Sequence, residues 1–107
     1  MTNPLLTDIT VNDAHALLDK QAVLVDVREP NETAAEAIPG SIKLPLSVLA
    51  RGEPANLPDG PVVFLCASGA RTTRNSAALA SLAKGDAYCM TGGIMAWKRA
   101  GLPTERG

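Results

Sequence analysis

The chain has 107 residues, a formal net charge of −1, and 46% hydrophobic but only 3% aromatic residues. This length fits one domain rather than two, and the near-neutral charge, with Lys and Arg spread along the chain, excludes the basic face that nucleic-acid binding requires. Its apolar runs are far shorter than the ~20 residues of a membrane helix, and its amino terminus has no secretory pattern. We therefore expect one domain over residues 1–107, no membrane segment and a cytoplasmic location.

The first half of the chain alternates predicted helices and strands. A capping pattern from Thr10 to Asp13 precedes an apolar helical face that ends at Leu18. Frequent glycine and proline over 51–60 predict a loop. Between these two features, β-rich and apolar segments predict a strand over 22–27, a short helix over 30–37, a short strand over 41–43 and one helical turn over 47–50.

The second half continues this alternation. The continuous apolar run over 62–65 predicts a strand covered on both faces. Apolar residues at three- and four-residue spacing then predict a helix from about 72 to 84, and a strand over 86–90 and a helix over 93–100 follow. Such a chain predicts an α/β fold in which helices on both faces flank a mainly parallel sheet of about five strands. Sites in such sheets lie at the carboxyl ends of strands.

Cys66 lies at such an end, between the apolar run and a helix start. Unpaired N–H groups and the helix dipole at such a turn favour an anion, so we expect the Cys66 thiolate to be stabilised. Gly69 is expected at positive φ, which lets successive amides converge on the sulfur, and Arg71 supplies a neighbouring cation. The other loop residues are small and are expected to leave the sulfur open: Ala67, Ser68 and Ala70.

Cys66 and its loop have two alternative interpretations. A lone cysteine after an apolar run is more often a core residue than a nucleophile, but the fixed spacing to Gly69 and Arg71 favours a site. The second alternative is a phosphatase or an arsenate reductase. Four residues separate Cys66 from Arg71, one fewer than in a C-x5-R phosphatase loop, so this tighter loop suits a smaller target atom.

The remaining candidates are interpreted as structural. Asp26 and Arg28 form the remaining polar pair. Asp26 lies inside an apolar strand and needs a partner if buried, so we expect a structural ion pair or hydrogen bonds to a neighbouring loop rather than acid–base catalysis. Cys89 is interpreted as a core residue, with a resolving thiol for Cys66 as the alternative. The two cysteines form no ligand cluster, so we expect no metal site. Packing or solvation rather than chemistry is expected for His15, Arg74 and Trp97.

The loop from Cys66 to Arg71 resembles the active-site loop of the rhodanese family, whose members carry a sulfane sulfur as a cysteine persulfide. The resemblance covers about 9–103, and the segment 45–49 is similar to the rhodanese portion of membrane-associated bacterial members. Thr33 and Glu36-Ala37 depart from the family pattern, which has an aromatic residue and Gly-His there. Other family motifs are present in order: Asp-x-Arg in 24–29, Ile-Pro-Gly in 38–42, and the closing segments 92–97 and 101–103.

The resemblance implies sulfurtransfer by covalent catalysis. In this reaction Cys66 takes a sulfane sulfur from thiosulfate or a low-molecular-weight persulfide and passes it to a thiol or cyanide acceptor, without a cofactor. Arg71 is expected to brace the loop and attract the donor, and uncharged residues at 67 and 68 predict poor use of thiosulfate. A persulfide carrier for a protein partner and a non-catalytic interaction domain remain alternatives. Substrate contacts are expected from Ala67, Ser68, Gly69, Ala70 and Thr72.

Overall fold

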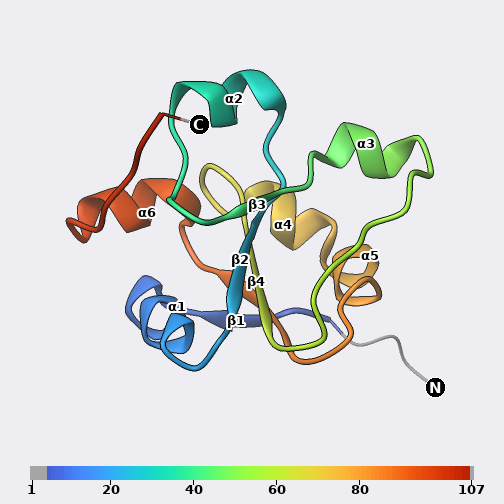
Figure 1. Ribbon diagram of the computed structural model, residues 1–107, viewed down its shortest axis with the longest axis horizontal. Helices are drawn as coiled ribbons and strands as arrows, with labels where there is room; N and C mark the ends of the chain where they lie inside the picture. The colour runs from blue at the N-terminus through green and yellow to red at the C-terminus, as the bar shows by residue number, and fades with distance from the viewer. Residues whose placement is uncertain (1–4, 107) are drawn as a thin grey trace.

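The computed structural model describes residues 5–106, in which strands and helices alternate along the chain (Figure 1). The strands all belong to one sheet, and the helices are short, the longest having eight residues. In chain order the elements are β1 (Thr7–Ile9), α1 (Val11–Leu18), β2 (Val23–Asp26), α2 (Pro30–Ala35), β3 (Ile42–Lys43), α3 (Leu46–Ala50), β4 (Val62–Leu65), α4 (Ala70–Arg74), α5 (Ser76–Ala80), β5 (Ala87–Met90) and α6 (Gly93–Arg99).

The sheet has five parallel strands in the order β1-β5-β4-β2-β3. This confirms the predicted parallel sheet flanked by helices. The central strand β4 is buried along its whole length, as its continuous apolar run predicts. Because all strands run the same way, the residues that follow β2, β4 and β5 meet at one edge of the sheet.

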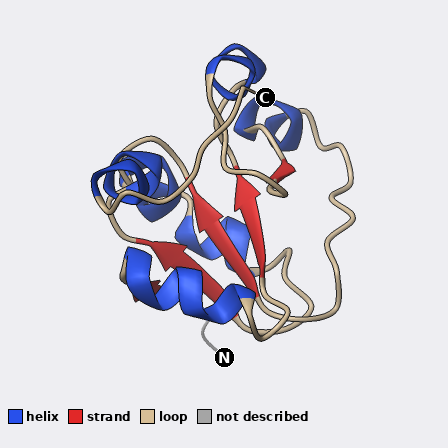
Figure 2. Cartoon of the chain, turned by 60° about the vertical axis from the view of Figure 1, so that its left-hand side comes forward, coloured by secondary structure: helices blue, strands red, loops and turns tan. Residues whose placement is uncertain are grey.

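Helices cover both faces of the sheet (Figures 1 and 2). On one face, Phe64 of β4 packs in a core cluster with Leu79 of α5. On the other face, Val63 packs in a second cluster with α1 and with Trp97 of α6. Successive β4 side chains therefore enter opposite clusters, as the period of a strand requires. None of the helices within residues 5–106 is long and apolar enough to cross a membrane.

The edge strand β1 is the element that the sequence analysis missed. It pairs with β5 alone, in a register that places Asp8 opposite Cys89. Two of its three residues are exposed, so it has no apolar run to mark it. Pairing with β5, far along the chain, defines this strand, and such pairing leaves no local signal in the sequence.

Two predicted helices are shorter in the structure than in the prediction. The helix expected over 72–84 is divided into α4 and α5 at Asn75, whose side-chain amide donates to the Arg71 carbonyl at 2.7 Å. Asparagine competes for backbone groups in this way, which explains the break. The helix expected over 30–37 ends at Ala35, because Ala37 instead forms an antiparallel bridge with Glu105.

Candidate functional site

Cys66 directly follows β4 and lies at the carboxyl edge of the sheet. Its carbonyl oxygen accepts a hydrogen bond from the Ile94 N–H at 2.9 Å, and that of Ala67 accepts one from the Met95 N–H at 3.1 Å. These two carbonyls are therefore held by the start of α6. A Cβ on Gly93 would lie 2.2 Å from the Cys66 oxygen, so only glycine permits this approach.

The loop after Cys66 curls back over the sulfur. Gly69 has a φ of 101°, which confirms the predicted positive φ. In this conformation the Gly69 N–H points at the Cys66 Sγ, with 3.1 Å between nitrogen and sulfur. The loop thus supplies a backbone donor to the sulfur without using any charged side chain.

The small loop side chains do not leave the sulfur open, contrary to the expectation from the sequence. Ser68 and Ala70 are exposed, but Cys66 itself is only 1% exposed. There are two reasons. The curl at Gly69 brings the backbone of the loop over the sulfur, and the buried side chain of Thr72 also contacts the sulfur. The site is therefore a backbone cradle around the Cys66 sulfur.

This cradle determines the ionisation of Cys66. Burial raises the pKa of the thiol, but the N–H groups of Thr72, Gly69 and Arg71 and the Thr72 hydroxyl lower it by more. The net pKa is below the ordinary thiol value, so the fold stabilises the thiolate relative to a free cysteine. These donors are the unpaired N–H groups that the sequence predicts at this turn, at the start of the five-residue helix α4.

Arg71 has a carboxylate partner that the sequence analysis did not identify. Its Nη1 and Nη2 donate to the two carboxylate oxygens of Glu32 at 2.7 and 2.8 Å. The pair lowers the pKa of Glu32 to about 2 and raises that of Arg71. Arg71 therefore ties the loop to α2, and its charge is already compensated. The two residues are 39 positions apart, and no local pattern in the sequence links them.

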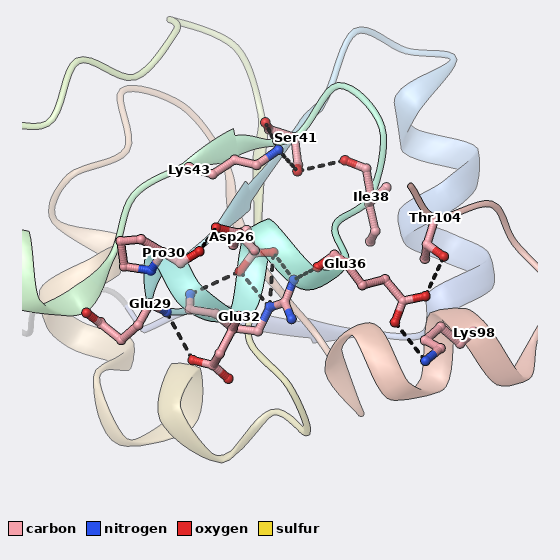
Figure 3. Close-up of polar contacts among 12 residues, drawn as sticks. Asp26, Glu29, Pro30, Glu32, Glu36, Ile38, Ser41, Lys43, Lys98 and Thr104 are labelled. Carbon is pink, nitrogen blue, oxygen red and sulfur yellow. Dashed lines mark hydrogen bonds and ion pairs between the residues drawn. The ribbon is translucent and has the colours of Figure 1, made fainter. Parts of the chain in front are cut away.

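The expected partner residues Asp26 and Arg28 form a buried ion pair beneath α2. Arg28 Nη2 lies 2.8 Å from Asp26 Oδ2 and also donates to the Glu36 carbonyl at 2.7 Å. Figure 3 shows the neighbouring contacts, in which the Glu36 carboxylate meets Lys98 and Thr104. These contacts hold the segments around α2 together.

The other candidates lie away from the cradle or beneath it. The ring of His15 packs edge-on against the ring of Trp97, with 5.7 Å between centroids, on the α1 side of the sheet. Arg74 is exposed and lines a depression of about 390 Å³ beside the loop, together with Cys89. Within residues 5–106, no group of three or more His, Cys, Asp and Glu side chains is arranged to hold a metal ion.

Residues 10–100 match the family model of the rhodanese-like domain. The chain is 37% identical over 84 residues to a sulfurtransferase of Allochromatium vinosum. The match covers 78% of this chain and 78% of that protein. It is 32% identical over 93 residues to the thiosulfate sulfurtransferase GlpE of Pseudoalteromonas translucida. This match covers 86% of this chain and 89% of that protein. The crystal structure of a rhodanese-related protein from Thermoplasma volcanium superimposes with a TM-score of 0.75 at 26% identity, over 94% of this chain and 99% of that one.

Proposed function

This chain belongs to the rhodanese-like domain family and its sulfurtransferases, and we propose that it transfers a sulfane sulfur through a persulfide on Cys66. The observation that carries the proposal is the backbone cradle. The Gly69 N–H lies 3.1 Å from the Cys66 sulfur, and the donors of the cradle lower the pKa of this thiol despite its burial. A stabilised thiolate is what nucleophilic attack on sulfur requires.

The proposed reaction has two displacement steps. In the first, the Cys66 thiolate attacks the outer sulfur of the donor, a new S–S bond forms on Cys66, and the donor's S–S bond breaks. The donor leaves as a thiolate, or as sulfite when the donor is thiosulfate. In the second step, an acceptor thiolate or cyanide attacks the outer sulfur of the Cys66 persulfide and releases the Cys66 thiolate. Sulfur moves between nucleophiles, so no external oxidant or cofactor is needed.

The loop residues have distinct proposed roles in these steps. The backbone of Ala67, Ser68, Gly69 and Ala70, together with Thr72, surrounds the sulfur and stabilises its negative charge. Arg71 acts on the loop through its ion pair with Glu32, which fixes the start of α4 against α2.

We assign the reaction to the cytoplasm, a reducing compartment that keeps thiols free, and both cysteines are free in the structure.

We propose a low-molecular-weight thiol persulfide as the preferred donor. The side chains of Ala67, Ser68 and Ala70 carry no charge. The nearest cation in the loop, Arg71, is compensated by Glu32. A dianion such as thiosulfate, which holds both of its charges on the reacting group, therefore finds little positive charge at this loop. The reacting end of a thiol persulfide bears at most one negative charge and needs less compensation.

The experiment is the intact mass of the protein after incubation with glutathione persulfide or thiosulfate, before and after a reductant. We expect the wild-type protein to gain one sulfur that the reductant removes, and to gain it faster from the persulfide. Cys66→Ser should gain none, whereas Cys89→Ser should still reach the one-sulfur end point. A reducible one-sulfur gain in Cys66→Ser would contradict the assignment of Cys66, and faster loading from thiosulfate would contradict the donor class.

A further inference from the structure

Cys89 lies beneath the loop, on the same face of the sheet as Cys66. The register of β4 and β5 places Cys89 opposite Phe64, two residues before Cys66, and both cysteines belong to one core cluster. The Thr72 hydroxyl lies between the two sulfurs. Its oxygen is 3.1 Å from the Cys89 Sγ and 3.8 Å from the Cys66 Sγ. The Thr72 oxygen therefore connects a thiol outside the proposed mechanism to the proposed nucleophile.

The hydrogen-bonding capacity of the Thr72 hydroxyl and the two sulfurs determines which of these groups donates. The Thr72 hydroxyl has one proton and two lone pairs, and it donates to the Gly69 carbonyl at 3.0 Å. A Cys66 thiolate can only accept, so the hydroxyl must turn its proton from the Gly69 carbonyl towards the sulfur in order to stabilise the anion. In both orientations the proton of the Thr72 hydroxyl points away from Cys89. The Cys89 S–H group is then the donor to the Thr72 oxygen, and this contact polarises the hydroxyl.

The surroundings of Cys89 keep it in the S–H form. Burial raises the pKa of its thiol, and the negative charges of Asp8 and Cys66 raise it further. Asp8 faces Cys89 from the neighbouring strand β1. Arg74 of α4 lines the same depression as Cys89, and it is exposed to solvent. A thiol with a raised pKa is a hydrogen-bond donor and a poor nucleophile at neutral pH.

We propose that Cys89 is a positioning residue for the sulfur-transfer site: its thiol donates to the Thr72 hydroxyl, which in turn donates to the anionic sulfur of Cys66. This proposal rests on the proposed function and deepens it, because it assigns a role to a buried side chain outside the loop. Cys89 carries no sulfur in this scheme. It acts only by strengthening the hydrogen bond that Thr72 makes.

The test measures the pKa of Cys66 in the folded protein through its Cβ chemical shift, with isotopically labelled cysteine, across pH. Cys89→Ala removes the donor and is expected to raise the midpoint of Cys66 by about 0.5 pH unit, which corresponds to roughly threefold less thiolate below the midpoint. Cys89→Ser keeps a donor at this position, so its midpoint should stay nearer to that of the wild type. A serine variant shifted as far as the alanine variant would contradict the proposal.

A double-mutant cycle with Thr72→Val separates this role from a general loss of packing. If Cys89 acts through Thr72, then Cys89→Ala should cause no further shift of the Cys66 midpoint once the hydroxyl is absent. An equal shift in both backgrounds, or no shift in either, overturns the proposal. Val63→Ala is the matched control, because Val63 is fully buried on β4 but belongs to the opposite core cluster. It should lower stability and leave the Cys66 midpoint unchanged.

A substitute variant and a donor-free measurement complete the test. If Cys89→Ala does not fold, Cys89→Val removes the donor while filling the space, and the same shift is expected of it. The titration needs no sulfur donor, so its result is independent of turnover. A midpoint that does not depend on Cys89, in a protein that gains sulfur on Cys66, contradicts the positioning role alone. A midpoint that moves as expected, in a protein that gains no sulfur, contradicts the proposed function alone.

Discussion

At the scale of single residues, Cys66 shows how a buried thiol can have a pKa below its ordinary value. The residue is 1% exposed, and burial alone disfavours a thiolate. The N–H groups of Thr72 and Gly69 reverse this balance because they are fixed by the fold and aimed at the sulfur. Preorganised donors of this kind cost no reorganisation when charge develops. The same arrangement would stabilise both the attacking thiolate and a thiolate released from the persulfide.

The conformation of Gly69 predicts a specific effect of substitution. Gly69→Ala would place a Cβ at a φ of 101° and 3.3 Å from the Gly92 nitrogen. The loop must then relax, and its N–H moves away from the sulfur. We expect a loss of stability of about 1 to 2 kcal/mol and a higher pKa for Cys66. The pKa is measured from the Cβ chemical shift of Cys66 as a function of pH.

Gly101→Ala is the control for this prediction. Gly101 also has a positive φ, 78°, but a Cβ there would have no atom within 4 Å, and it lies outside the loop. It should lose a similar amount of stability to backbone strain without moving the Cys66 midpoint. A Cys66 midpoint that moves equally in both variants would show that strain anywhere in the chain, rather than the curl of the loop, controls the thiol.

At the scale of elements, α2 and α4 are joined by one carboxylate. Glu32 accepts the Glu29 N–H at 3.0 Å, which closes a capping box at the start of α2. The same carboxylate holds Arg71 of α4 with two hydrogen bonds. The side chains of the pair are about one third exposed, so solvent weakens but does not remove the attraction. One side chain therefore both caps α2 and fixes the end of the loop that follows Cys66.

Removal of this carboxylate should change stability in a pH-dependent way. The pKa of Glu32 is about 2 in the folded protein, against 4.5 for a free glutamate. The pair therefore stabilises the fold above pH 4.5, and this contribution is lost as the pH falls towards 2. Glu32→Gln should lower the free energy of unfolding by about 1 kcal/mol at neutral pH, with a difference from the wild type that vanishes in acid, as measured by urea unfolding.

Glu53→Gln provides the comparison. Glu53 also pairs with an arginine, Arg51, but the two side chains are 51% and 63% exposed. This exposed pair is screened by solvent, so its removal should not measurably change stability. Equal losses in the two variants, or a Glu32→Gln difference that persists in acid, would contradict the role given to the α2–α4 link.

At the scale of the whole molecule, the fold follows from patterns that can be read locally. The apolar run of β4 and the alternation of helices and strands predict the parallel sheet, and the spacing from Cys66 to Arg71 predicts the loop at its edge. The positive φ of Gly69 also follows from its place in this loop. These features depend on short stretches of sequence, which is why pattern analysis finds them.

Other features depend on contacts between distant residues, and the sequence alone does not show them. The edge strand β1 is defined by its pairing with β5, and Glu32 meets Arg71 only because α2 and α4 flank the same edge of the sheet. The contact between Thr72 and Cys89 is of the same kind. The near-complete burial of Cys66 also depends on how the loop closes in three dimensions. These contacts refine how the site works rather than where it lies.

The folded loop is expected to make Cys66 a reactive thiolate at neutral pH. The measurement that checks this expectation is the rate of sulfur uptake on Cys66 as a function of pH, followed by intact mass, with a donor whose charge is constant over the range. We expect the rate to rise with a midpoint below the ~8.5 of a free cysteine. A rate that rises only at or above that value, or a sulfur found on another residue, would contradict it.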